Sequence, residues 1–145
     1  MPPRKPSPAR AIANVRRIFK AFETGDVSDA ADYLHPDYFN RESDDRSNAR
    51  GPDELAHSVA WLRGAFSELK FEEQDVIAAG DKVAMRVVMS GCHTGDFIGH
   101  AATGRRFAAE QMHLFTLWNG KILTHHAVRD DLTMHRQLGL LGPKG

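Results

Sequence analysis

The sequence lacks the residue patterns that define many metal, nucleotide and membrane proteins. Its 145 residues include one cysteine, Cys92, which excludes an internal disulfide and fits a reducing cytoplasm. It has no CxxC pair, no HExxH motif and no glycine-rich phosphate loop, so a structural metal, a zinc protease site and a nucleotide fold are all unsupported. No apolar run approaches the length that spans a membrane.

The sequence also has no excess of either charge. Nineteen lysines and arginines balance nineteen aspartates and glutamates, whereas a nucleic-acid-binding protein usually shows a basic excess. The segment Met1–Pro8 is basic and proline-rich, and no hydrophobic stretch follows it as in a secretory signal. We therefore expect a disordered tail over residues 1–8 and one domain over residues 9–145, with neither nucleic acid nor membrane as a partner.

The first half of the chain has helical periodicity. Ser7-Pro8 is typical of a helix start, and Gly25 of a helix end. A short second helix is predicted over Ser28–Leu34 and a third from Gly51-Pro52. Between the last two we expect a brief strand over residues 37–40 and a polar loop over residues 41–50. Apolar residues recur at helical spacing in the first helix: Ile12, Val15, Ile18, Phe19 and Phe22.

The second half has the alternation of long strands. Lys70–Ala79 and Lys82–Cys92 flank the turn Gly80-Asp81, and Arg105–Trp118 and Lys121–Asp131 flank Asn119-Gly120. A last helix is predicted over Leu132–Leu138. Helices followed by a meander of antiparallel strands define an α+β fold.

The Asn119-Gly120 hairpin predicts a polar site. A two-residue turn makes residues whose numbers sum to 239 face each other, so His113 should lie opposite His126. Because side chains alternate with period two, one otherwise apolar face should carry several polar groups. A β-bulge would shift this parity. The residues predicted to share the face are Gln111, His113, Phe115, His126 and Asp130.

Two segments resemble a known family, the SnoaL-like polyketide cyclases. Gly91–Gly99, continuing to Thr103-Gly104-Arg105, is similar to the family's G-x-H-x-G-x-F-x-G…TGR stretch. Asn119-Gly120-Lys121-Ile122, followed by His125 and Asp130, is similar to its closing segment. The likeness runs from about Ile12 to Gly139.

The resemblance implies a fold and a reaction. Such proteins are similar to nuclear transport factor 2 and ketosteroid isomerase. A strongly curved antiparallel sheet packs against about three N-terminal helices, giving a cone-shaped α+β barrel with a central cavity. Members are usually homodimers or higher oligomers and use no metal and no organic cofactor. They close the last ring of an aromatic polyketide by an intramolecular aldol condensation, with an aspartate as general acid/base.

The resemblance also implies a candidate site for a hydrophobic, polycyclic or polyketide-like small molecule. Asp130 matches the family's acid/base, and His113 is the second catalytic candidate, to orient the aspartate or to donate to an oxyanion. His126, Asn40 and Arg129 depart from the family pattern, which usually has tryptophan, histidine and an apolar residue there. The residues predicted to bind substrate are Asn40, Trp61, Met85, Arg86, Gln111, Phe115 and His126.

Several alternatives stay open at the level of sequence. Asp130 precedes a helix and could simply cap it, and the histidines could be structural. With Asp130, the pair His113 and His126 could instead hold a metal. A hydroxylase, a dehydratase or an epoxide hydrolase would use the same fold, the last with Asp130, Arg86 and Asp75 acting together. A non-catalytic small-molecule-binding protein is the remaining alternative.

Overall fold

The computed structural model describes residues 5–41 and 48–142. Residues 1–4 of the predicted tail and most of the polar loop predicted over residues 41–50 lie outside these ranges. Nine elements follow one another in the described part of the chain, with two helices and a 3₁₀ turn before the long strands. The α+β class is therefore confirmed.

The helices begin and end at residues that cap them. The Ser7 side chain accepts a hydrogen bond from the Arg10 amide (3.2 Å), and α1 (Pro8–Thr24) starts with proline. Gly25 adopts φ 81° and donates to the Ala21 carbonyl (2.8 Å), which ends α1. The later helical elements are η1 (Ala30–Asp32), a single turn, α2 (Pro52–Ala65) and α3 (Asp131–Leu138).

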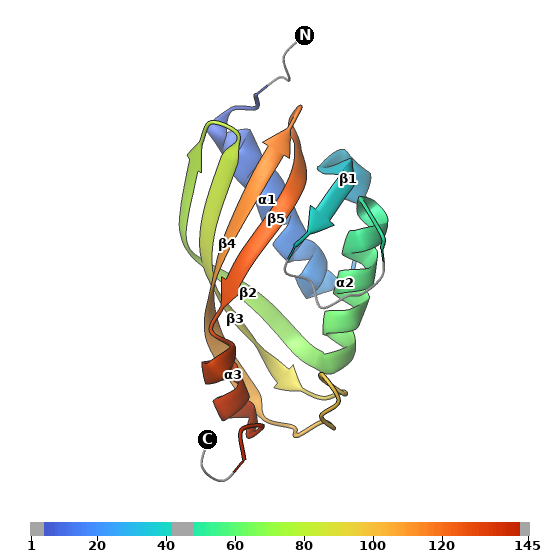
Figure 1. Ribbon diagram of the computed structural model, residues 1–145, viewed down its shortest axis with the longest axis vertical. Helices are drawn as coiled ribbons and strands as arrows, with labels where there is room; N and C mark the ends of the chain where they lie inside the picture. Colours follow the sequence, from blue (N-terminus) through green and yellow to red (C-terminus); the bar gives the residue numbers. More distant parts are fainter. Residues whose placement is uncertain (1–4, 42–47, 143–145) are drawn as a thin grey trace.

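The strands form one curved sheet in the order β1-β5-β4-β3-β2. Consecutive strands β2 to β5 are antiparallel, whereas β1 runs parallel to β5, so the sheet is mixed at that edge. Figure 1 shows the long strands twisting across the molecule, with α2 beside β1 and α3 at the end of β5. The strands are β1 (Leu34–Asn40), β2 (Phe66–Ala79), β3 (Lys82–His93), β4 (Arg106–Trp118) and β5 (Lys121–Arg129).

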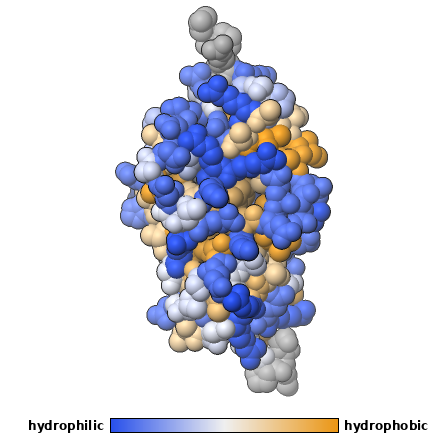
Figure 2. All heavy atoms as spheres, turned by 180° about the vertical axis from the view of Figure 1, so that it is seen from behind, coloured by the Kyte–Doolittle hydropathy of each residue, from blue (hydrophilic) through white to orange (hydrophobic). Residues whose placement is uncertain are grey.

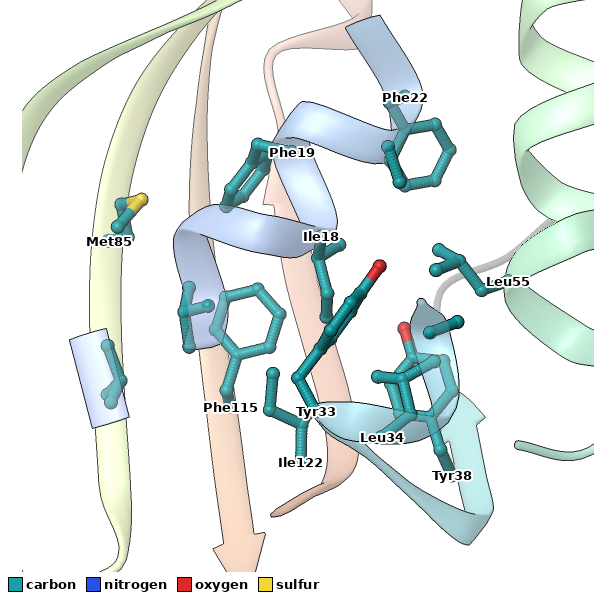
Figure 3. Packing of buried hydrophobic residues seen from close by; sticks show 14 of the residues in the cluster. Ile18, Phe19, Phe22, Tyr33, Leu34, Tyr38, Leu55, Met85, Phe115 and Ile122 are labelled. Carbon is teal, nitrogen blue, oxygen red and sulfur yellow. The ribbon is translucent and has the colours of Figure 1, made fainter. Parts of the chain in front are cut away.

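The main core lies between α1 and the inner face of the sheet. Ile18 and Phe19 of α1 are buried and lie near Phe115 of β4 (Figure 3), and the Phe19 and Phe115 rings meet edge to face at 6.0 Å. Seen from behind (Figure 2), the surface is mostly hydrophilic and its hydrophobic patches are separated. The apolar residues of the predicted helix stripe thus face inward, as their period indicates.

A β-bulge at Leu123 shifts the hairpin register by one residue. Trp118 pairs with Lys121 and Leu117 with Ile122, as the two-residue turn predicts, but Thr116 then pairs with Thr124. Beyond the bulge, His125 takes the inner position and His126 the outer one. The predicted pairing of His113 with His126 is therefore wrong, because one extra residue on β5 reverses its parity.

Candidate active site

A pocket opens on the inner face of the sheet, between α1, α2 and α3. Its volume is about 100 Å³. Its walls are mainly apolar, and Gln111, His113 and His125 bring polar groups to the sheet side. Apolar wall residues include Phe19, Phe22, Phe71, Met89 and Phe97.

A chain of buried hydrogen bonds crosses this side of the pocket. His113 Nδ1 lies 2.7 Å from His125 Nε2, and His113 Nε2 lies 2.8 Å from Gln111 Oε1. The Tyr38 hydroxyl lies 3.1 Å from His125 Nδ1. The parallel strand β1 supplies Tyr38, the bulged strand β5 supplies His125, and β4 supplies the other two residues. All of these side chains are buried, so the chain is shielded from water.

The hydrogen-bond partners determine which atom donates and which accepts at each step of this hydrogen-bond chain. Because Gln111 Oε1 only accepts, His113 carries its proton on Nε2 and accepts at Nδ1. His125 then donates from Nε2, and its Nδ1 accepts from the Tyr38 hydroxyl. At the far end, Gln111 Nε2 donates to Met89 Sδ (3.0 Å). Each ring nitrogen of both histidines therefore has a partner. The Gln111 amide is held in one orientation, because its oxygen accepts from His113 and its nitrogen donates to Met89.

Both histidines are held neutral. Burial, followed by the charge of Arg129, lowers the pKa of His113 to about 3. Burial, followed by the proximity of His113, lowers the pKa of His125 well below its usual value. Burial likewise raises the pKa of the Tyr38 phenol well above its usual range. The hydrogen-bond chain thus consists of uncharged side chains near neutral pH.

Asp130 does not line the pocket. It caps α3, where its Oδ1 accepts from the Thr133 amide (3.1 Å) and its Oδ2 from the Thr133 hydroxyl (2.6 Å). These hydrogen bonds lower the pKa of its carboxyl, and its side chain is exposed. The prediction that Asp130 shares a face with His113 is wrong, because the bulge at Leu123 reverses the alternation of side chains along β5. Its catalytic role stays a prediction, and the geometry favours the helix cap.

Two residues next to Asp130 in the sequence line the pocket instead. Arg129 and Asp131 both line it, together with His135, whose Nδ1 lies 2.7 Å from the Asp131 carbonyl. Trp61 of α2 and Phe97 also line the pocket, with ring centroids 5.8 Å apart. Among the described residues, the lining therefore combines aromatic surfaces with one permanent cation and one carboxylate.

The other predicted site residues divide into two groups. Asn40, Trp61 and Gln111 line the pocket with His113. Met85 and Phe115 are buried in the core instead, where Phe115 stacks on the His125 ring at 4.3 Å. His126 is exposed on the outer face, opposite to its predicted place.

Arg86 also faces outward, contrary to its predicted role in the cavity. It pairs with Asp75 across the strands, as the Gly80-Asp81 turn predicts, and bonds Asp75 Oδ2 (2.6 Å) and Glu110 Oε1 (2.7 Å). A catalytic set of Asp130, Arg86 and Asp75 is therefore excluded by geometry. Among the described residues, no group of three or more histidine, cysteine, aspartate or glutamate side chains is placed to hold a metal.

Among the residues of the pocket and its hydrogen bonds that sequence reasoning did not predict are His125, Tyr38, Arg129 and Asp131. His125 carries a motif match but was assigned to the outer face, and Tyr38 lies in a short edge strand without a distinctive pattern. Arg129 was noticed only as a charge in place of an apolar residue. Asp131 directly follows Asp130 and has no separate motif that would distinguish it.

Comparison with known proteins identifies the family of this fold and pocket. The family model for the SnoaL-like polyketide cyclases matches residues 13–138. The chain belongs to this family. Aklanonic acid methyl ester cyclase AcmA of Streptomyces galilaeus is 42% identical over 129 residues, which cover 88% of this chain and 90% of AcmA. Nogalonic acid methyl ester cyclase of Streptomyces nogalater is 38% identical over 123 residues, covering 84% and 92% of the two chains.

A solved structure supports the same fold. TsrD from Streptomyces laurentii superimposes with a TM-score of 0.85 at 26% identity, covering 94% of this chain and all of TsrD. The mixed sheet with helices on its inner face is thus the fold of the SnoaL-like family.

No helix in residues 5–41 or 48–142 has the length and apolar character that a membrane span requires.

The neutral histidines predict a specific dependence of stability on pH. Below pH 6.5 the unfolded chain protonates each histidine, whereas native His113 stays neutral to about pH 3. The free energy of unfolding should therefore fall as the pH decreases from 6.5 toward 3. In His113→Asn the unfolding free energy should change less steeply with pH than in the wild type, by up to about 1.4 kcal/mol per pH unit. Urea unfolding between pH 7 and 4 measures both slopes.

His57→Asn is the matched control, because His57 is exposed on α2. Its unfolding free energy should follow the wild-type pH profile. Parallel profiles for wild type and His113→Asn would contradict a buried neutral His113.

Proposed function

We propose that this protein is a cofactor-independent cyclase that closes a ring of a polycyclic polyketide ester by intramolecular aldol condensation. The observation that carries the proposal is the apolar pocket with a polar wall of uncharged hydrogen-bonding groups and a carboxylate, Asp131, in its lining. The cyclases to which the chain is 38–42% identical support a substrate of this class.

The shape of the pocket supports a flat, partly exposed substrate. The enclosed part, about 100 Å³, is smaller than the roughly 300–1,000 Å³ of ordinary ligand sites. The fused rings of such a substrate would therefore extend beyond the pocket, over the exposed ring of Trp61. The reacting end would then enter the narrow part beside Gln111.

The proposed reaction needs one proton acceptor and one carbonyl. A C–H group between two carbonyls loses its proton to a carboxylate, and the electron pair spreads over the resulting enolate. The enolate carbon attacks a ketone or aldehyde carbon, which forms the C–C bond and an alkoxide. The carboxylic acid returns its proton to the alkoxide, so nothing is oxidised and no co-reactant is consumed.

We assign the carboxylate role to Asp131. It is the one carboxylate among the described lining residues, whereas both oxygens of Asp130 are engaged by Thr133. The histidines cannot accept a proton without breaking the chain, since each ring nitrogen is already bonded. His113 and His125 are thus positioning residues that orient the Gln111 amide toward the developing oxyanion.

Two isosteric variants separate the assignments. Asp131→Asn should reduce kcat by about 10²–10⁴-fold, the usual contribution of a general acid/base, while its Tm stays near the wild-type value. Asp130→Asn should keep most activity, since asparagine is also a good helix cap. The measurement is ring closure of an aklanonic-acid-type methyl ester, followed by chromatography.

The reverse pattern, with activity lost in Asp130→Asn and kept in Asp131→Asn, would restore the role predicted from sequence.

A non-catalytic small-molecule-binding protein is the second candidate, because the helix cap occupies Asp130. It predicts saturable binding of the ester without turnover by the wild-type protein.

We further propose that the protein is a cytoplasmic homodimer, joined through the outer face of β4 and β5. Met112, Leu114 and Val128 are 49%, 39% and 77% exposed, and Met112 pairs directly with Val128 across the strands. A contiguous apolar face on a sheet supports an interface between copies. Leu114→Glu should halve the mass measured by light scattering, and a monomeric wild-type protein would contradict the proposal.

A further inference from the structure

The loop between β3 and β4 contains a two-residue turn at Ile98-Gly99. Phe97 and His100 exchange backbone hydrogen bonds in both directions, each 2.9 Å long, so the turn closes a short hairpin. Ile98 adopts φ 47° and Gly99 φ 78°, the positive values that a type I′ turn requires. A positive φ is an outlier for a β-branched residue, because its Cβ comes close to the following carbonyl oxygen. The turn therefore places isoleucine where asparagine or glycine is favoured.

A second turn of this chain has the favoured residue. Asn119-Gly120 joins β4 and β5 with φ 50° and 80°, close to the values at Ile98-Gly99. Asn-Gly is the pair that type I′ turns prefer. The two turns thus have similar φ values at both central residues, and they differ in the residue at the first of them.

Packing within the fold does not explain the isoleucine. Ile98 is 57% exposed, so its side chain contributes little to the core. The neighbouring residues hold the turn in place instead. Phe97 is buried against Phe66, with ring centroids 4.9 Å apart, and the Gly95 amide donates to the Ala65 carbonyl (3.0 Å). A strained residue that its surroundings hold in place is typical of functional sites.

Ile98 lies in the lining of the pocket. Of the large hydrophobic side chains in the described lining, Trp61 and Ile98 are the exposed ones. Both are close to Phe97: the Trp61 ring lies 5.8 Å from the Phe97 ring, and Ile98 follows Phe97 in the sequence. A ligand too large for the pocket of about 100 Å³ would therefore have its remaining rings beside these two side chains.

We propose that Ile98, together with Trp61, binds the rings of the substrate that extend beyond the pocket and thereby selects polycyclic over monocyclic ligands. The class of ligand rests on the proposed function. Contact with a flat ring system removes the exposed isoleucine from water, which favours binding in proportion to the apolar area buried. A one-ring ligand lies within the pocket and leaves Ile98 in water. The strained turn is thus the conformation that presents an apolar side chain at this place.

A reciprocal exchange between the two turns tests the inference. Ile98→Asn should raise the Kd for alizarin, a three-ring dye, by about 5–10-fold, the effect of burying roughly half an isoleucine side chain. The Kd for 2-hydroxyacetophenone, which has one ring, should not change. The Tm of Ile98→Asn should rise by about 2–4 °C, because asparagine tolerates a positive φ. Equilibrium dialysis and thermal unfolding provide these measurements.

Asn119→Ile is the matched control, because Asn119 lies outside the lining of this pocket. It should lower the Tm and bind both probes as the wild type does. Ile98→Gly is a second variant that relieves the strain and removes the side chain, and it should reproduce the binding of Ile98→Asn.

Kinetics separate this inference from the proposed function. Ile98→Asn should raise KM for the polyketide ester about 5–10-fold with little change in kcat, because Ile98 contacts the rings and not the reacting atoms. The role of Ile98 would be overturned by an equal alizarin Kd in wild type and variant, by an equal loss of affinity for both probes, or by a wild type that does not bind alizarin. Turnover by the wild type would still support the cyclase in each case. Absence of turnover, with an alizarin affinity that depends on Ile98, would overturn the cyclase and support the ring-binding site.

Discussion

The hydrogen bond between His113 Nδ1 and His125 Nε2 is the interaction on which the site depends. It exists only because a bulge at Leu123 turns His125 inward across from β4. Two neutral imidazoles in an apolar wall satisfy each other, and Tyr38 and Gln111 satisfy the two outer nitrogens. A buried polar network of this kind is stable only when every member is paired.

The same network links the fold to the chemistry. It connects β1, β5 and β4, so the parallel edge strand is part of the site and not only an addition to the sheet. It also fixes the orientation of the Gln111 amide, which lines the pocket. Arg129 and Asp131 line the same pocket.

Local signals were sufficient to predict most of the fold. Ser7, Gly25 and Asn119-Gly120 act on their immediate neighbours, so the first helix and the last hairpin begin and end close to where the sequence indicates. The parallel pairing of β1 depends on contacts distant in the sequence, and its short length gives no sign of its direction.

The candidate site was predicted less well, and one cause explains most of the errors. Leu123 is an ordinary apolar strand residue, so no glycine or polar residue in the sequence marks the bulge. The resulting shift exchanged His126 for His125 and moved Asp130 from the predicted inner face to the helix cap. The wrong placement of Arg86 has a separate cause. Side chains on β3 alternate as predicted, but Arg86 belongs to the set that faces outward.

The tautomeric state of the two histidines tests the account most directly. Nitrogen-15 NMR of the side chains should show His113 and His125 both neutral at pH 5, each with its proton on Nε2. Tyr38→Phe should leave His113 in the same state while changing the His125 Nδ1 shift. An imidazolium at pH 5, or a proton on Nδ1 of either ring, would contradict the directional chain and the inward turn of His125.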